Sequence, residues 1–267
     1  MKSSPSARAS RSIQSIEVGF QIVRAIEEKS KPLTLGEIAR TVDMPGGSVH
    51  PYLVSLSKVG MVRQEAATGR YGLGPYAVQL GLAGIRQLDV FEAAKPVLTD
   101  LRDETGLSIY LSVWGNRGPA IIHRLDGNLD APAAVSVGWV LPVLWTAMGQ
   151  ICLTYLPRTV TRQQVMAERL SQVAYASLTD AEFEAIIEQT IAAVLENGIA
   201  STDSQIAEGY AAMAAPICDH KGALLAVVTV IGLRATLQPH PDSPNAKRLK
   251  MAVQNISMAM GYKPHEP

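Results

Sequence analysis

Cysteine and aromatic residues are scarce in this sequence of 267 residues, which contains two cysteines and 5% phenylalanine, tryptophan and tyrosine. Cys152 and Cys218 lie far apart in apolar stretches and match no metal-binding or redox spacing, so we expect two buried thiols. The motifs HExxH, CxxC and GxSxG are absent, and the five histidines are scattered. We therefore expect no catalytic residues, no metal site and no cofactor.

Long apolar runs and a net charge are also missing. No run approaches the roughly 18 to 20 residues that cross a membrane, and the first residues, MKSSPSARASRS, lack the apolar core of a signal peptide. The sequence therefore predicts a cytoplasmic protein with no membrane partner. The formal net charge is zero, but residues 1–86 hold eleven Lys and Arg against six Asp and Glu, whereas the remainder holds thirteen against eighteen. This separation favours a polyanionic partner for the first third of the chain.

Residues 13–74 contain the pattern of three helices followed by a hairpin. Apolar residues recur at steps of three and four from Ile13 to Ile26, which predicts an amphipathic helix. Thr34 and Glu37 form a capping box at the start of a short second helix, and a PGG turn precedes a third periodic stretch. Two extended runs around a Thr-Gly turn then predict a hairpin. Helices and hairpin in this order are typical of a winged helix-turn-helix.

The third of these helices is the candidate DNA-reading helix. Such a helix places its N-terminal residues at base edges in the major groove. With Ser48 as the N-cap, Pro51 falls at the third helical position, where it removes no hydrogen bond. The helix has no arginine, so cations must come from the N-terminal arm, from its own last turn and from the hairpin. The candidate DNA-binding residues are Thr34, Gly46, Gly47, Ser48, His50, Tyr52, Lys58, Arg63 and Arg70.

The remaining segments complete a two-domain organisation. Residues 1–12 are rich in serine and basic residues and are expected to be a disordered basic arm, and residues 75–88 predict a linker helix. Residues 89–262 form the second domain, with helices expected over 89–104, 146–156, 179–198 and 245–260. The strands expected there are SIYLSVW, AIIHRLD, AAVSVG, AAMAAPIC and ALLAVVTVIG. Strand hairpins with segregated helices indicate an α+β fold with an antiparallel sheet.

Six ordered blocks of the chain resemble IclR-type transcriptional regulators. The blocks are QSIEVGFQIV, SVHPYLVSL, GRYGLGPYAVQLG, KPVLTDLRDETG, LPVLWTAMGQICLTYLP and EGYAAMAAPICDHKGALLAVVTVIG, and the resemblance covers nearly all of residues 13–262. It implies a winged helix-turn-helix joined to a GAF-like domain for effector binding and oligomerisation. It also implies a homodimer or dimer of dimers that binds pseudo-palindromic, double-stranded operator DNA. Such a protein represses or activates a catabolic operon in response to a small molecule.

The same resemblance places an effector pocket at the start of the helix near residue 146 and on the last two strands. From the residues themselves, Thr146 is a good helix cap, and the small residues behind it leave backbone N–H groups open to an anion. Trp145, Met148 and Met213 would add apolar surface, which favours a small organic acid with an aromatic or longer hydrophobic body. The candidate effector-binding residues are Leu144, Trp145, Thr146, Ala147, Met148, Gly149, Asp203, Met213 and Thr229.

Other interpretations of these residues remain open. Pro51 stands where the family usually has arginine, and Gln150 where it usually has lysine or arginine. One alternative is therefore a small-molecule-binding protein whose winged helix binds a protein partner rather than DNA. Another is an enzyme in the second domain. The tryptophans are equally compatible with a core or an interface, and Asp203 with the cap of a turn.

Overall fold

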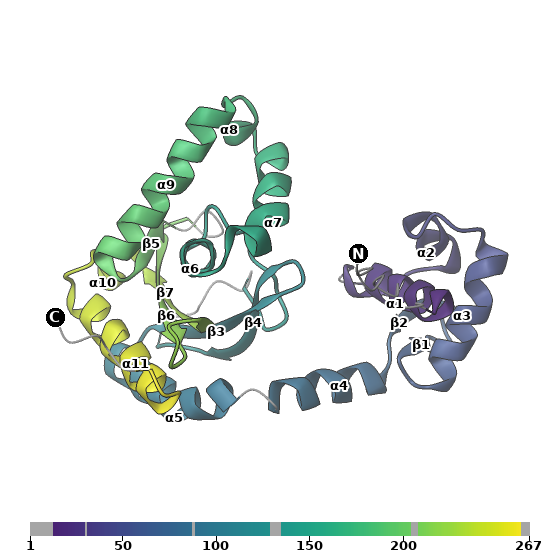
Figure 1. Cartoon of the computed structure of the whole chain (residues 1–267). Helices are drawn as coiled ribbons and strands as arrows, with labels where there is room; N and C mark the ends of the chain where they lie inside the picture. Colours follow the sequence, from purple (N-terminus) through teal and green to yellow (C-terminus); the bar gives the residue numbers. More distant parts are fainter. Residues whose placement is uncertain (1–12, 30, 87–88, 129–134, 204–207, 263–267) are drawn as a thin grey trace, which may run out of the picture. The chain divides into compact units, whose positions relative to one another are not determined.

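The computed structural model describes residues 13–29, 31–86, 89–128, 135–203 and 208–262. The chain divides into an N-terminal unit, Met1–Gln87, and a C-terminal unit, Leu88–Pro267 (Figure 1). The predicted basic arm, residues 1–12, lies outside the described residues. Among the described helices, none combines the length and the apolar character that a membrane crossing demands.

The N-terminal unit contains the predicted three helices and hairpin. Its elements are α1 (Gln14–Glu27), α2 (Leu35–Thr41), α3 (Gly46–Lys58), β1 (Val62–Gln64), β2 (Tyr71–Leu73) and α4 (Pro75–Arg86). The core forms where Ile22 and Ile26 of α1 meet Ile38 of α2 and Leu53 of α3, all of them buried. β1 and β2 pair antiparallel as the wing. The helix-turn-helix is confirmed, and α4 occupies most of the range predicted for the linker helix.

The start of α3 differs from the prediction. The helix begins at Gly46, with Pro45 at the N-cap, because the N–H groups of Ser48 and Val49 both donate to the Pro45 carbonyl, at 2.9 and 3.2 Å. Ser48 is therefore not the cap, and Pro51 lies in the second turn, where its ring removes the N–H that would donate to the Gly47 carbonyl. The structure accommodates this loss because Gly47 and Pro51 are exposed, so water can reach the carbonyl.

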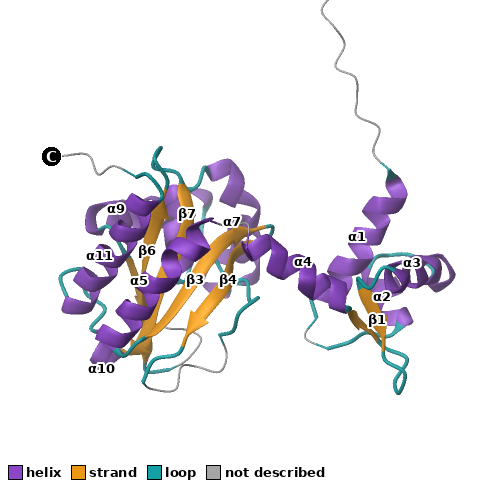
Figure 2. Ribbon diagram, turned by 90° about the horizontal axis from the view of Figure 1, so that it is seen from below, coloured by secondary structure: helices purple, strands orange, loops and turns teal. Residues whose placement is uncertain are grey.

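The C-terminal unit is built on one antiparallel sheet with strand order β4-β3-β7-β6-β5. One face is covered by two helices that pack against each other and the other by a short helix, as Figure 2 shows for the first face. The strands are β3 (Ser108–Gly115), β4 (Gly118–Leu125), β5 (Ala200–Asp203), β6 (Tyr210–Cys218) and β7 (Leu224–Leu233). The two helices are α5 (Asp89–Thr105) and α11 (Pro244–Ala259), and the short helix is α6 (Ala147–Tyr155). An α+β fold with an antiparallel sheet is confirmed.

Three further helices and one short helical turn complete this unit, which also differs from the prediction in its strands. The helices are α7 (Arg158–Ser171), α8 (Val173–Ala176) and α9 (Asp180–Asn197), followed after the sheet by the single turn α10 (Arg234–Leu237). The expected strand AAVSVG is wrong over its described part, residues 135–138, which form a turn because Gly138 has a φ of 89°. The segment still follows β4: Val140 forms a bridge with Ala120, and backbone hydrogen bonds join residues 138–141 to β4. At the opposite edge of the sheet, β5 is a short strand that the sequence did not predict.

Both cysteines are buried, as predicted from their apolar surroundings. Cys152 of α6 is 0% exposed and Cys218 at the end of β6 is 7% exposed. Burial raises the pKa of the Cys152 thiol to about 12 and that of Cys218 to about 11. Both side chains are therefore protonated thiols near neutral pH.

Candidate nucleic-acid interface and ligand site

The first turns of α3 present small and polar groups at the surface. Ser48 and His50 are exposed and Tyr52 is half-buried, while Val49 and Leu53 anchor the opposite side of the helix in the core. A Cβ added to Gly47 would meet no described atom within 4 Å, so the backbone there is open to close approach. This part of α3 therefore has the shape of a groove-reading helix end without a cation of its own.

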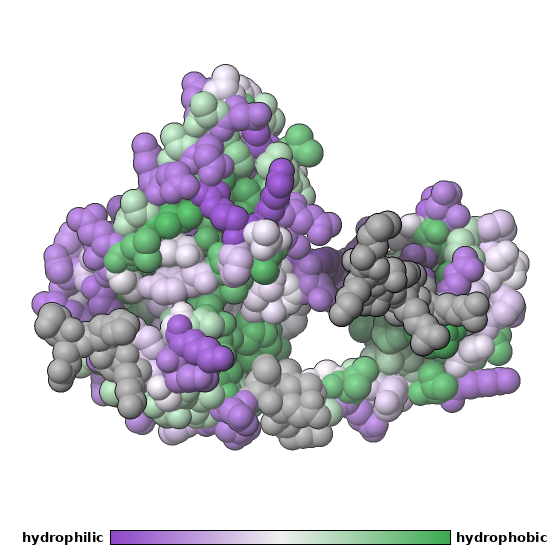
Figure 3. Space-filling view, in the orientation of Figure 1, coloured by the Kyte–Doolittle hydropathy of each residue, from purple (hydrophilic) through white to green (hydrophobic). Residues whose placement is uncertain are grey.

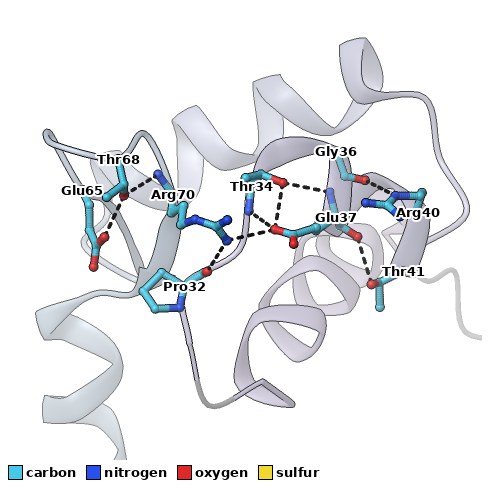
Figure 4. A network of polar contacts seen from close by, with 9 residues as sticks. All are labelled: Pro32, Thr34, Gly36, Glu37, Arg40, Thr41, Glu65, Thr68 and Arg70. Carbon is cyan, nitrogen blue, oxygen red and sulfur yellow. Dashed lines mark hydrogen bonds and ion pairs between the residues drawn. The ribbon is translucent and has the colours of Figure 1, made fainter.

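The wing is tied to the start of α2 by a polar network drawn in Figure 4. Glu37 Oε2 accepts hydrogen bonds from the Thr34 N–H at 2.7 Å and the Thr34 hydroxyl at 2.8 Å, and the Glu37 N–H donates back to Thr34 Oγ1. Arg70 joins this capping box, because its guanidinium donates to Glu37 Oε2 at 3.2 Å and to the Pro32 carbonyl at 3.1 Å. The hydrogen bonds from Thr34, more than the charge of Arg70, lower the pKa of Glu37.

The candidate DNA-binding residues therefore fall into two groups. Thr34 and Arg70 are held by Glu37 and join α2 to the wing. Lys58, in the last turn of α3, is exposed, and Arg63 in β1 has a side chain 58% exposed with a loose contact of 3.9 Å to Glu65. Of the cations proposed for phosphate contact, Lys58 and Arg63 are the ones whose charge is most available to a partner.

The N-terminal unit also has a large exposed apolar surface. A groove of about 260 Å³ lies between α1 and α3, and its walls include Ile16, Phe20 and Leu56. In α4, hydrophobic side chains stand out into solvent and are visible in the space-filling view (Figure 3). These are Tyr76, Val78, Leu80 and Leu82, each between 46% and 61% exposed. An apolar surface of this kind marks a protein–protein contact more often than a DNA contact.

In the C-terminal unit, the N-terminus of α6 is packed tightly against the segment before it. Thr146 caps the helix: its Oγ1 accepts from the Gly149 N–H at 3.1 Å, and its hydroxyl donates to the Pro142 carbonyl at 2.6 Å. A Cβ added to Gly149 would lie 2.3 Å from the Pro142 carbonyl oxygen and 2.5 Å from the Val143 Cα. The lack of a side chain at Gly149 is therefore what lets the segment approach the helix.

The sheet face beneath α6 holds two buried hydroxyls without a hydrogen-bond partner among the described residues. Tyr110 of β3 is 0% exposed and Thr229 of β7 is 1% exposed, and the two are directly paired across neighbouring strands. Tyr110 packs in the same cluster as Ala147 and Met148 of α6. A buried hydroxyl that loses its water without gaining a partner costs about 1–3 kcal/mol. Two such groups side by side make this face the candidate ligand site.

The candidate effector residues do not all lie on this face. Leu144, Thr146, Ala147, Met148 and Gly149 surround the start of α6, and Thr229 lies beneath the helix. Met213 instead belongs to the core packed by α5 and α11, because alternate residues of β6 point to opposite faces. Asp203 ends the edge strand β5, where its exposed side chain pairs with Arg234. Trp145 packs against a third cluster formed with α7 and α9. The structure thus keeps Asp203 and Met213 apart from the other candidates.

Two residues that the sequence analysis missed contribute to this region. Tyr110 lies in a predicted strand, but the sequence does not show which face of the sheet it occupies. Glu168 of α7 accepts hydrogen bonds from the backbone N–H groups of Val143, at 2.6 Å, and Leu144, at 2.9 Å. Burial raises the pKa of Glu168, and these two hydrogen bonds oppose the rise. Nothing in the local sequence signals this contact, since its partners are about 25 residues away and are backbone groups.

Comparison with known proteins assigns both units to one family. The model of the IclR helix-turn-helix domain matches residues 15–66, and that of the C-terminal region of bacterial IclR transcriptional regulators matches residues 82–258. The glycerol operon regulatory protein of Streptomyces griseus is 31% identical, over 94% of this chain and 96% of its own length. The crystal structure of Pseudomonas aeruginosa HmgR is 31% identical, covers 94% of this chain and 100% of its own, and has a TM-score of 0.58.

A further solved structure shares the fold at lower identity. It is an IclR homologue from Microbacterium hydrocarbonoxydans complexed with 4-hydroxybenzoate, 19% identical, covering 92% of this chain and 99% of its own, with a TM-score of 0.72. The curated relatives are transcriptional regulators rather than enzymes. Because the C-terminal family model alone matches more than half of the sequence, the chain belongs to the IclR family of bacterial transcriptional regulators.

Proposed function

We propose that this IclR-family regulator binds operator DNA as a dimer through α3 and the wing, and releases or remodels that complex when a small aromatic carboxylic acid binds beneath α6. It acts in the cytoplasm, where its operator is accessible, and controls an operon for the breakdown of such acids. The observation that carries the ligand part is the pair of buried, unpartnered hydroxyls of Tyr110 and Thr229.

The chemistry around these hydroxyls favours an acid with an apolar body. The N–H groups of Ala147 and Met148, at the start of α6, have no partner within the helix and can donate hydrogen bonds to an anion at its positive end. Ile121 and Met148 supply apolar walls. The guanidinium of Arg124 lies 5.7 Å from the Tyr110 ring but already donates to Asp126 and the Val135 carbonyl. Hydroxyls and backbone N–H groups, rather than a free cation, would therefore bind the ligand's polar atoms. The 4-hydroxybenzoate bound by the Microbacterium homologue belongs to this chemical class.

The surface of the N-terminal unit supports DNA binding that depends on the backbone phosphates. The exposed cations Lys58 and Arg63 can contact phosphates, and the exposed groups of Ser48 and His50 can reach base edges. A dimer would place two copies of α3 about 34 Å apart, one turn of duplex. The apolar groove between α1 and α3 and the exposed apolar side chains of α4 supply the surface for that dimer.

Fluorescence anisotropy with the protein's own upstream DNA tests this proposal. Affinity should fall steeply as salt rises, and the Lys58→Ala/Arg63→Ala double variant should bind about tenfold or more weakly with a shallower salt dependence. Adding 4-hydroxybenzoate should shift the binding curve of the wild type, but not that of Thr229→Val. Binding that ignores salt and sequence alike would exclude an operator-specific role.

A second candidate function is favoured by the same apolar surface and the absence of cations from the first turns of α3. In this function the helix-turn-helix binds a protein partner. Sedimentation of the purified chain with and without DNA separates the two functions: the DNA-binding regulator forms a complex with duplex that the Lys58→Ala/Arg63→Ala variant lacks. A protein-binding module would show no such complex, and the charge substitutions would leave its association unchanged.

A further inference from the structure

Glu168 is a partly buried carboxylate that neither DNA binding nor the proposed ligand contacts explain. It lies in α7, yet it hydrogen-bonds the backbone of a different segment, Val143 and Leu144, with one carboxylate oxygen to each N–H. Two consecutive backbone N–H groups that point at one carboxylate form a small anion site. In this chain the carboxylate of Glu168 in α7 is the anion that occupies this site.

The segment held by Glu168 leads directly into the N-terminus of α6. The side chain of Thr146 bonds the Pro142 carbonyl, and Gln150 Nε2 donates to the Leu144 carbonyl at 3.3 Å. The segment lies so close to Gly149 that a Cβ at this position would collide with the backbone of residues 142 and 143. The backbone at Val143 and Leu144 is therefore fixed on one side by α6 and on the other by Glu168.

We propose that Glu168 is a positioning residue for the ligand site, and that its carboxylate sets where residues 142–146 lie at the start of α6. The inference rests on the proposed function, in that the site it shapes is the one beneath α6. Val143 and Leu144 also pack in a cluster with Val165 of α7 and Phe183 and Ile187 of α9. Through Glu168, a change in the placement of α7 is transmitted to the ligand site.

The protonation state of Glu168 changes how firmly it holds this segment. As a carboxylate it accepts both N–H groups, whereas as a neutral acid one oxygen carries a proton and accepts poorly. The titratable group coupled to it is the Tyr175 phenol of α8, whose pKa is raised by burial and by the charge of Glu168. The neighbouring Arg169 directs its guanidinium away, to Asp180 and the Leu178 carbonyl. The N–H signals of Val143 and Leu144 should therefore titrate together, with a midpoint above the ordinary pKa of glutamate.

Amide NMR of the full chain, labelled on valine and leucine, tests the proposal without any effector. In the wild type, the N–H signals of Val143 and Leu144 should shift with pH along one common curve. In Glu168→Gln the curve should vanish, and exchange of both amides should accelerate by about tenfold, since one good acceptor is replaced by a donor. The matched control is Glu184→Gln, which removes an exposed partner of Arg158 in the neighbouring helix α9 and should leave both amides unchanged.

Glu168→Ala provides a second, independent measurement. Sodium formate should restore the slow exchange of the two amides in this variant, and sodium chloride at the same ionic strength should not. The proposal is overturned if the two amides of Glu168→Gln exchange and titrate as in the wild type, or if formate gives Glu168→Ala no more protection than chloride.

Binding of 4-hydroxybenzoate separates this proposal from the proposed function. If the acid binds the wild type, its affinity should fall about tenfold in Glu168→Gln and stay unchanged in Glu184→Gln. If the wild type does not bind the acid, the proposed ligand class is wrong, and the amide titration still decides the role of Glu168.

Discussion

A threonine hydroxyl in the N-terminal unit and one in the C-terminal unit differ in their hydrogen bonding. Thr34 in the N-terminal unit uses its hydroxyl fully, accepting from one backbone N–H and donating to Glu37, whereas Thr229 in the C-terminal unit buries a hydroxyl with no partner among the described residues. The first arrangement stabilises the fold at once. The second costs stability until something else supplies the hydrogen bond, which is why we propose a ligand there.

Charge is also distributed differently in the two units. The cations available to a partner in the N-terminal unit, Lys58 and Arg63, lie at the surface and act through screened, long-range attraction. In the C-terminal unit, the polar groups of interest are buried and act over a single hydrogen bond. We therefore expect DNA binding to depend strongly on salt and ligand binding to depend on shape and hydrogen-bond geometry.

The largest effect is expected from glycine. Gly149→Ala should destabilise the C-terminal unit by about 3 kcal/mol, because its Cβ would collide with the backbone of residues 142 and 143. Gly19→Ala, in α1 of the N-terminal unit, is the matched change, since no described atom lies within 4 Å of its Cβ. It should stabilise the helix by about 0.5–1 kcal/mol. Tryptophan fluorescence during urea unfolding measures the effect of Gly149→Ala, because Trp114, Trp139 and Trp145 all lie in the C-terminal unit. Circular dichroism during unfolding measures the effect of Gly19→Ala.

Threonine-to-valine changes should have opposite signs in the two units. Thr229→Val removes an unpartnered hydroxyl and should raise the unfolding free energy by about 1 kcal/mol while abolishing the response to 4-hydroxybenzoate. Thr34→Val removes a helix cap and should lower the unfolding free energy by about 1 kcal/mol. Equilibrium unfolding without ligand measures both. A loss of stability in Thr229→Val would mean that its hydroxyl already has a partner.

The two wing arginines should separate DNA binding from stability. Arg63→Ala should reduce the slope of log affinity against log salt by about one, with no change in melting temperature. Arg70→Ala should lower the melting temperature only slightly, because solvent screens its half-exposed ion pair with Glu37. Identical behaviour of the two variants in thermal melts and in salt titrations would contradict this division of roles.

The smallest effect is a pH dependence that differs in sign between Glu37 and Glu168. The pKa of Glu37 is lowered on folding. Its contribution to the unfolding free energy is therefore present above the ordinary glutamate pKa and is lost as pH falls through the pKa of the folded state. The pKa of Glu168 is raised on folding. Its contribution to the unfolding free energy is therefore present at low pH and is lost as pH rises through the pKa of the folded state. The stability deficit of Glu37→Gln should therefore grow between pH 3 and pH 6, whereas that of Glu168→Gln should shrink, as urea titrations at each pH would show.

Local chemistry explains which parts of the fold the sequence revealed. The capping boxes at Thr34 and Thr179 involve residues three positions apart, so both helix starts could be predicted. The start of α3 could not be predicted in this way. Local rules favour a proline in the first turn, but α3 places Pro51 in its second turn, where the surface is exposed and water can reach the carbonyl that lost its partner. Helix α7 has no counterpart among the predicted elements, although its apolar residues follow helical spacing and its buried described residues are Thr161 and Val165.

For the candidate ligand site, the sequence indicates a position but not the set of residues that line it. The family blocks locate the start of α6 and the last two strands, and Thr229 indeed lies beneath the helix. Which face of β6 a residue occupies depends on register with its neighbours, so Met213 was grouped with residues on the other side of the sheet. Tyr110 and Glu168 act through contacts between segments far apart in the chain, which single-sequence patterns do not encode.

Pro51 gives the first turn of α3 a particular thermodynamic character. The turn begins with two glycines, Gly46 and Gly47, and the proline leaves the Gly47 carbonyl without its helical N–H. Glycine loses more conformational entropy than any other residue when its backbone is fixed. Fixing this turn in the folded helix therefore carries an entropic cost that an alanine-led helix would avoid, so Gly46→Ala and Gly47→Ala should each stabilise the free protein.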